Sequence, residues 1–243
     1  MDNRELKGFA RDMGADLVGV ADVALLEGIQ TEPKDLLKNF KRAISIGVRL
    51  SDGIINPIDD RPTPLYQQHY LKVNALLDDI ALRVSQFIQD CKSVALPIPA
   101  SQVLNKEQWY SYISHKAVAI AAGVGWQGKS LLVVSPDYGP RIRLVTILTD
   151  MSLRPDKPIR NRCGKCAACT DACPVQAIKG VNTTRHYSER DEALFFEKCV
   201  ERVTGNARDL PFIESPICGV CIRACPWGAS KKGRRMNLRN IDE

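Results

Sequence analysis

Eight of the nine cysteines in this 243-residue chain lie between residues 163 and 225, and their spacing is that of metal-cluster ligands. The first run is Cys163-x2-Cys166-x2-Cys169-x3-Cys173-Pro174, and the second is Cys218-x2-Cys221-x3-Cys225-Pro226. A [4Fe–4S] cluster needs four thiolates, and in two-cluster ferredoxins the cysteine before the proline binds the other cluster. One cluster is therefore predicted on Cys163, Cys166, Cys169 and Cys225, and the other on Cys173, Cys199, Cys218 and Cys221. Neighbouring clusters move electrons singly, which predicts an electron-transfer protein or a reductase.

Other uses of cysteine fit this pattern less well. Zinc ribbons use separated C-x2-C pairs and do not need the longer run that ends in proline. A secreted disulfide scaffold would be short and would follow a signal peptide, whereas this chain opens with the polar residues 1–5. Cys91 stands apart from the other eight, at the end of an amphipathic pattern, and is predicted to be a small buried residue.

Composition predicts an ordinary soluble globular protein, with 44% hydrophobic and 26% charged residues and a formal net charge of +6. The longest nearly apolar run, residues 117–126, is too short to cross a bilayer. With reduced metal-binding thiols, this predicts a cytoplasmic protein without a membrane span. The basic run at 231–235 is interpreted as a solvated tail, with contact to nucleic acid or to an acidic redox partner as the alternative.

The elements that position these residues follow from the hydrophobic pattern. Helices are predicted over 6–13 and 73–88, and strands over 17–20, 43–50, 131–134 and 144–148, which indicates an α/β layer. Prolines and charges near 152–161 mark a boundary. The predicted domains are an α/β domain at 1–155, a two-cluster ferredoxin domain at 156–230 and a basic tail at 231–243. An insertion at 182–216 includes a predicted helix, 191–203, that delivers Cys199.

A second candidate site lies in the first domain, where Gly123-Val-Gly-Trp126-Gln-Gly-Lys129-Ser130 is followed by Arg141 and by Thr149-Asp150. Closely spaced glycines allow a backbone to approach a large ligand, and the polar side chains here suit phosphate or amide groups. The order matches neither a dinucleotide fingerprint nor a P-loop. The alternative is that Trp126 and the glycines only pack a helix on the sheet.

The sequence resembles the epoxyqueuosine reductase family. The resemblance is carried by the motifs above together with Leu148-Thr149-Asp150, Cys163-Gly-Lys-Cys166 and the closing Cys-Pro-Trp227. The chain looks like a short form without that family's C-terminal helical repeats, and reductive dehalogenases share the plan. The resemblance implies a cobalamin-binding α/β (α+β) domain, distantly nitroreductase-like, followed by a bacterial-type two-[4Fe–4S] ferredoxin domain. It implies corrinoid contacts from Ser101, Lys116, Gly125, Trp126, Gly128, Lys129, Ser130, Arg141 and Thr149.

The family's acidic proton donor has no counterpart here, because the matching stretch, residues 97–102, carries no carboxylate. His115 is then the candidate acid, with a pKa near working pH that the neighbouring Lys116 would depress. Tyr112, together with Tyr110, and Asp150 are further candidates. A structural histidine and a backbone-holding aspartate are the alternatives.

The expected function is a corrinoid-dependent iron–sulfur reductase in which two clusters pass single electrons to cobalamin. The expected partners are an external donor of the ferredoxin or flavodoxin type and a small-molecule substrate that the sequence does not identify. Without the helical repeats and the acid, a tRNA substrate is doubtful. Two alternatives are an electron-transfer partner of another corrinoid protein, with no substrate of its own, and an iron–sulfur flavoprotein that binds FMN.

Overall fold

The computed structural model describes residues 2–184, 190–210 and 212–229. Its contacts divide the chain into two units that interleave along the sequence. The first unit comprises Met1–Val48, Val73–Gly125 and Arg143–Ile159, and the second comprises Arg49–Lys72, Trp126–Ile142 and Arg160–Glu243. The predicted linear boundary near residue 155 differs from this division, because residues 49–72 and 126–142 pack with the cysteine-rich part of the chain.

The first unit is built on a four-stranded sheet with the order β1-β2-β6-β3. Its strands are β1 (Leu17–Asp22), β2 (Arg42–Arg49), β3 (Ala95–Ile98) and β6 (Ile142–Thr149). β1 pairs antiparallel with β2, and β3 pairs antiparallel with β6. The predicted strands at 17–20, 43–50 and 144–148 are thus present. β3 was not predicted, because Pro97 and Pro99 weaken the strand signal, and proline is tolerated mainly on edge strands such as this one.

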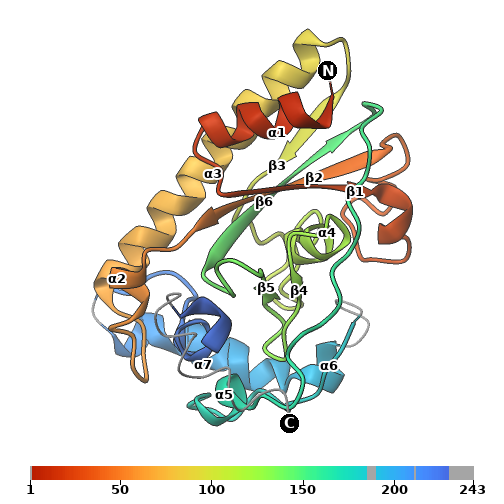
Figure 1. The fold of residues 1–243 in the computed structure, drawn as a ribbon. Coiled ribbons are helices and arrows are strands. Elements are labelled where there is room, and N and C mark those ends of the chain that lie inside the picture. Colours follow the sequence, from red (N-terminus) through yellow and green to blue (C-terminus); the bar gives the residue numbers. More distant parts are fainter. Residues whose placement is uncertain (1, 185–189, 211, 230–243) are drawn as a thin grey trace. The chain divides into compact units, whose positions relative to one another are not determined.

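Helices cover the sheet in the first unit. α1 (Asn3–Asp12) and α3 (Pro64–Asp90) lie on one side of it, and α4 (His115–Ala121) lies on the other (Figure 1). Phe9 of α1 stacks on Phe87 of α3 with ring centroids 4.3 Å apart. Asp2 caps α1 by accepting a hydrogen bond from the backbone N–H of Glu5 at 2.9 Å. The short 3-10 helix η1 (Val23–Leu26) follows β1. These layers agree with the predicted α/β architecture.

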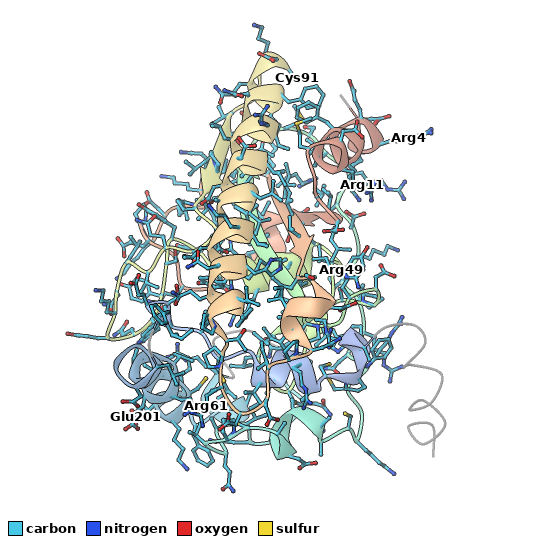
Figure 2. All side chains as sticks on the ribbon, turned by 90° about the vertical axis from the view of Figure 1, so that its left-hand side faces the viewer. Arg4, Arg11, Arg49, Arg61, Cys91 and Glu201 are labelled. Atoms are coloured by element: carbon cyan, nitrogen blue, oxygen red, sulfur yellow. The ribbon has the colours of Figure 1, made fainter. Side chains whose placement is uncertain are left out.

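Cys91 directly follows the last residue of α3, and it is exposed (Figure 2). The prediction of a small buried residue was wrong. The amphipathic pattern of α3 does not extend to this position, because Gln89, Asp90 and Lys92 around it are also exposed.

The second unit combines a small hairpin with short helices. β4 (Trp126–Gln127) pairs antiparallel with β5 (Val133–Val134), so the strand predicted at 131–134 forms only in its second half. The helices are α2 (Asp52–Ile55), α5 (Ala168–Asp171), α6 (Arg190–Ala193), α7 (Phe196–Asp209), α8 (Val220–Ala224) and the 3-10 helix η2 (Pro226–Gly228). The predicted basic tail, 231–243, lies outside the described residues. In the part of the chain that the structure describes, no helix is long and apolar enough to span a membrane.

Candidate metal centre

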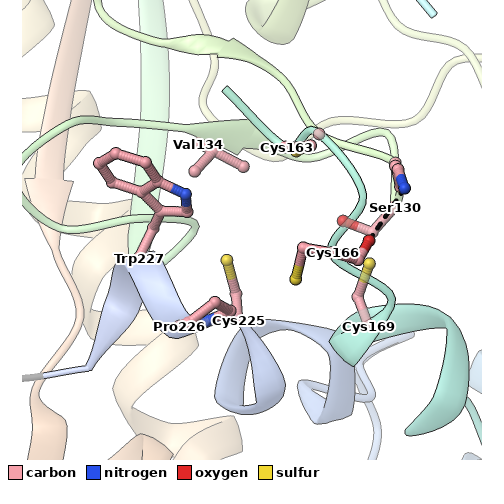
Figure 3. A pocket seen from close by; sticks show the side chains of 10 residues that line it. Ser130, Val134, Cys163, Cys166, Cys169, Cys225, Pro226 and Trp227 are labelled. Atoms are coloured by element: carbon pink, nitrogen blue, oxygen red, sulfur yellow. Dashed lines mark hydrogen bonds between the residues drawn. The ribbon is translucent and has the colours of Figure 1, made fainter. Parts of the chain in front are cut away.

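Four thiols from both cysteine runs converge on one cavity in the second unit (Figure 3). We call Cys163, Cys166, Cys169 and Cys225 the first thiol set. In Figure 3 the sulfur atoms of Cys166, Cys169 and Cys225 point into a common space, with Trp227 and Val134 at its border. The remaining lining residues are Gly128, Lys129, Ser130 and Pro226. The structure thus brings together the four cysteines that the ferredoxin rule assigns to one cluster.

The local backbone explains why these thiols meet. The side-chain amide of Asn161 donates to the carbonyl oxygen of Gln127 at 2.8 Å, and its Oδ1 accepts the N–H of Cys163 at 2.8 Å. The N–H of Cys166 then donates to the carbonyl oxygen of Cys163 at 3.0 Å, which closes a tight turn. Cys225 stands between α8 and η2, where Pro226 begins the new helix. Asn161 therefore ties the start of the first motif to β4.

The other four cysteines form a second thiol set, Cys173, Cys199, Cys218 and Cys221. Burial raises the pKa of the Cys221 thiol, and the sulfurs of Cys218 and Cys199, then that of Cys169 from the first set and that of Cys173, raise it further. Cys221 and Cys173 also pack against a buried apolar group formed by Leu131, Ile178, Ala193 and Leu194. Cys199 is carried by α7, in agreement with the helix that the sequence predicted for it.

Burial raises the pKa of four of these thiols, Cys169, Cys218, Cys221 and Cys225. It raises the pKa of Cys225 to about 12, and the sulfurs of Cys163 and Cys169 add to the effect against a backbone hydrogen bond from Trp227. Burial also raises the pKa of Cys169 and, still further, that of Cys221. Metal binding at such sites displaces the protons, because the thiolate is the ligand.

The donor set fits [4Fe–4S] clusters. Within the described residues, no group of three His, Cys, Asp or Glu side chains is placed to hold a single metal ion. The four thiols of the first set line one cavity, and four cysteine ligands are what a [4Fe–4S] cluster requires. Two such sets, each drawing one cysteine from the other motif, account for all eight clustered cysteines.

The glycine-rich segment lies beside the first thiol set. The indole Nε1–H of Trp126 donates to Cys163 Sγ at 3.4 Å. The Nζ of Lys129 donates to the carbonyl oxygen of Cys166 at 2.9 Å, the hydrogen bond dashed in Figure 3. Sequence reasoning missed this role and assigned both residues to a corrinoid. No local signal in the sequence indicates these contacts, which join residues 37 positions apart.

Two glycines of this segment are explained by protein contacts. Gly123 follows α4 with a φ of +67°, and its N–H donates to the carbonyl oxygen of Ile120, as expected of a helix-ending glycine. A Cβ on Gly128 would lie 2.8 Å from Val134 Cγ2, so the hairpin needs a glycine there. These contacts agree with the alternative interpretation, in which the glycines serve packing.

Several other predicted site residues are engaged within their own unit. Arg141 is buried and donates from Nη1 to Asp52 Oδ1 at 2.7 Å and to Asn56 Oδ1 at 2.8 Å. The hydroxyl of Thr149 donates to the carbonyl oxygen of Val94 at 2.6 Å, and Asp150 Oδ1 accepts the N–H of Val94 at 2.8 Å. Thr149 and Asp150 thus hold the backbone that leads into β3.

His115 has partners at both ring nitrogens. Nε2 lies 2.9 Å from the carbonyl oxygen of Pro99, and Nδ1 lies 2.8 Å from the hydroxyl of Thr146. A carbonyl only accepts, so Nε2 carries a proton, and a ring with its pKa lowered to about 4 is neutral near pH 7, so that Nδ1 accepts from the Thr146 hydroxyl. Burial lowers the pKa of His115 to about 4, the Pro99 carbonyl works against this, and Arg143 lowers it further. The expected influence of Lys116 is not among these causes.

The contacts of the remaining candidate site residues do not test the roles predicted for them, which therefore stay predictions. Ser101 is exposed, whereas Lys116, on α4, and Tyr112 are partly buried. The carbonyl oxygen of Tyr112 accepts the N–H of Glu32 at 2.9 Å. Gly125 is buried, and it is the last residue of its segment in the first unit.

Comparison with known proteins agrees with this metal centre. Residues 162–228 match the family model of a 4Fe-4S double cluster binding domain. Over 138 residues the chain is 39% identical to an epoxyqueuosine reductase of Bacillus cereus, a match covering 54% of this chain and 32% of that protein. The chain therefore matches about a third of the length of this curated relative.

Two solved structures share the fold. A reductive dehalogenase, studied for B12-dependent dehalogenation, superimposes with a TM-score of 0.76 at 18% identity, covering 98% of this chain and 33% of that one. An epoxyqueuosine reductase from Bacillus subtilis superimposes with a TM-score of 0.60 at 21% identity, covering 94% of this chain and 65% of that one. Both kinds of relative thus share the fold of nearly the whole of this chain.

Proposed function

We propose that this chain, a relative of epoxyqueuosine reductases and reductive dehalogenases, is an iron–sulfur oxidoreductase that relays single electrons through two [4Fe–4S] clusters. The observation that carries the proposal is the crossed arrangement of thiols, in which Cys225 of the second motif joins Cys163, Cys166 and Cys169 of the first at one cavity. Such crossing places two clusters close together, which is the arrangement of two-cluster ferredoxins.

The electrons that pass through the clusters need a final acceptor, and we propose that this acceptor is a corrinoid. This is supported by the relatives, of which one acts through B12. A bound corrinoid would supply the low-potential cobalt chemistry, and the protein would orient the substrate and manage protons. Trp126, Lys129 and Arg141, expected to hold it, are engaged within the second unit. Ser101, Lys116 and Gly125, which the family resemblance also assigned to the corrinoid, remain candidates for contacting it.

The chain's own residues constrain how a proton reaches the substrate. His115 is neutral at working pH and both of its nitrogens are engaged, so we do not assign it as the acid. Tyr112 becomes the leading candidate for proton donor. An external ferredoxin or flavodoxin would supply electrons, and the substrate would be a small molecule.

The relay is tested by anaerobic reconstitution of the full chain with iron and sulfide. We expect about eight irons per chain and, after reduction, an EPR spectrum of two interacting S = 1/2 centres. About four irons with one isolated signal, or stoichiometric zinc in protein purified without reconstitution, would refute the two-cluster relay.

The proposed corrinoid acceptor is tested separately. Hydroxocobalamin is added to the reconstituted protein, and gel filtration then removes the unbound corrinoid. Stoichiometric corrinoid that survives filtration supports the proposal, and a Tyr112→Phe variant should retain it, because the proposed proton donor does not hold the cofactor. Retention of flavin alone would indicate an FMN protein, and retention of neither would indicate an electron carrier. In both of these outcomes the cluster count remains valid.

A further inference from the structure

The first thiol set has a buried cation as its neighbour. Lys129 is only 7% exposed, and its Nζ reaches the backbone of Cys166 inside the cavity. None of the ion pairs among the residues that the structure describes includes Lys129. A buried ammonium without a counter-charge is costly. A [4Fe–4S] cluster on four thiolates is anionic, and it would supply that charge.

Trp126 adds a directed hydrogen bond to the same set. Its indole Nε1–H donates to Cys163 Sγ, and the ring is 1% exposed. The ring is fixed edge-on to Trp227 at 4.9 Å between centroids, and the Arg162 guanidinium lies 5.8 Å from its centre. An indole held on two sides has little freedom to withdraw its N–H from the sulfur.

The second thiol set has different neighbours. Cys173 Sγ accepts the N–H of Ala177 at 3.3 Å, and an apolar group covers this side. Arg202 is the cation here, and its Nη2 donates to the carbonyl oxygen of Asp60 at 2.8 Å. Arg202 stands three positions after Cys199 on α7, so the two side chains share a face of that helix. Each set therefore has its own basic residue.

We propose that Lys129 and Trp126 set the reduction potential of the first cluster, the one on the first thiol set, and that Arg202 does the same for the second. The inference rests on the proposed two-cluster relay. Reduction adds one electron to a cluster that is already anionic, so a nearby ammonium and a hydrogen bond to a ligand sulfur stabilise the reduced form and raise the potential. Lys129 and Trp126 contact the cysteine ligands and not the substrate, so their effect on the reaction passes through the potential of the cluster.

The experiment is an anaerobic redox titration of the full chain followed by EPR. Lys129→Met keeps the aliphatic stem but removes the charge, so we expect one of the two potentials to fall. Lys129→Arg should restore most of that potential. Trp126→Phe keeps a ring and loses the N–H, and it should lower the same potential by a smaller amount. Arg202→Met is the matched control and should lower the other potential.

The outcomes separate the two proposals. Equal shifts of both potentials in Lys129→Met, or no shift, would overturn the inference. If that variant still binds a full complement of iron, the two-cluster relay stands. A wild-type protein without two clusters would overturn both. If Lys129→Met fails to hold iron, Trp126→Phe and Arg202→Met decide the matter, because the inference requires them to lower different potentials.

Discussion

Asp52 bridges two arginines of the second unit. Its Oδ1 accepts from Nη1 of the buried Arg141 at 2.7 Å, and its Oδ2 accepts from Nη2 of Arg49 at 2.5 Å. The Arg141 side chain is 5% exposed and that of Asp52 is 27% exposed. A guanidinium that sequence reasoning assigned to a cofactor thus holds α2 against the segment that follows β5.

Breaking this pair should destabilise the second unit. We expect Asp52→Ala to lower the free energy of unfolding by about 2 to 4 kcal/mol, because it leaves a buried guanidinium with only its bond to Asn56. Asp52→Asn retains an acceptor and should cost less. Urea unfolding of both variants measures the difference. Equal stability of Asp52→Ala and wild type would contradict the structural role given to Arg141.

His115 should make stability depend on pH. Its folded pKa of about 4 lies below the usual 6.5, so the unfolded chain binds a proton that the folded chain does not. This stabilisation is fully present above pH 6.5 and is lost as the pH falls toward about 4, to a total of about 3 kcal/mol.

The His115→Gln variant isolates that contribution, because glutamine retains a donor for the Pro99 carbonyl without a titrating group. Anaerobic urea unfolding between about pH 7.5 and 5.5 should show a weaker loss of stability for the variant than for wild type. Parallel pH profiles would show that His115 does not titrate as inferred.

Cys199 should be a cluster ligand, whereas Cys91 should not. Cys199→Ala should lower the iron content from about eight toward about four, or convert one cluster to a [3Fe–4S] form. Cys91→Ala removes an exposed thiol outside both sets and should leave the iron content unchanged. Iron analysis measures the loss of a cluster, and EPR of the oxidised protein detects a [3Fe–4S] form. An undiminished iron content in Cys199→Ala, without a [3Fe–4S] signal, would refute the assignment of Cys199 as a ligand.

Gln67 should support the second thiol set from a distance. It is 3% exposed, its Oε1 accepts the N–H groups of Glu214 and Ser215, and its Nε2 donates to the carbonyl oxygen of Phe212. These bonds fix the segment that leads to Cys218. Gln67→Leu leaves its backbone partners unsatisfied, at a cost of about 2 to 4 kcal/mol.

The neighbouring Gln68 is exposed, so Gln68→Leu is a matched control. We expect Gln67→Leu, and not the control, to lose iron from one cluster in moderate urea. Iron retention measured after desalting separates the two variants, and equal retention would argue against this support.

The features with strong local signals were predictable from the sequence. Cysteine spacing predicted that Cys163, Cys166, Cys169 and Cys225 would meet, and these four line one cavity, because ligand geometry restricts how far apart the thiols of one cluster stand along the chain. The buried face of α3, with Val73, Leu77 and Ile80, repeats at helical spacing and was equally clear.

What the sequence could not reveal depends on contacts between distant segments. Nothing local to Trp126 or Lys129 indicates that they meet Cys163 and Cys166, some 37 positions away. Arg141 pairs with Asp52 across 89 positions, and His115 meets Thr146 across 31. Each of these side chains is of a type that cofactor sites also use, so their chemistry alone did not distinguish a structural from a catalytic role.

The interleaving of the two units limits how this architecture can be divided or exchanged. A fragment cut at residue 156 would carry all eight ligand cysteines but none of β4, β5 and α2, and neither Trp126 nor Lys129. The matched double-cluster segment, 162–228, is therefore smaller than the body that holds the clusters. A transfer of only the residues after 156 to another protein would move the cysteine ligands without the hairpin and the helix α2 that pack with them. Residues 143–159 of the first unit separate the hairpin from the cysteines along the sequence, so an exchange that preserves the site has to include both of them.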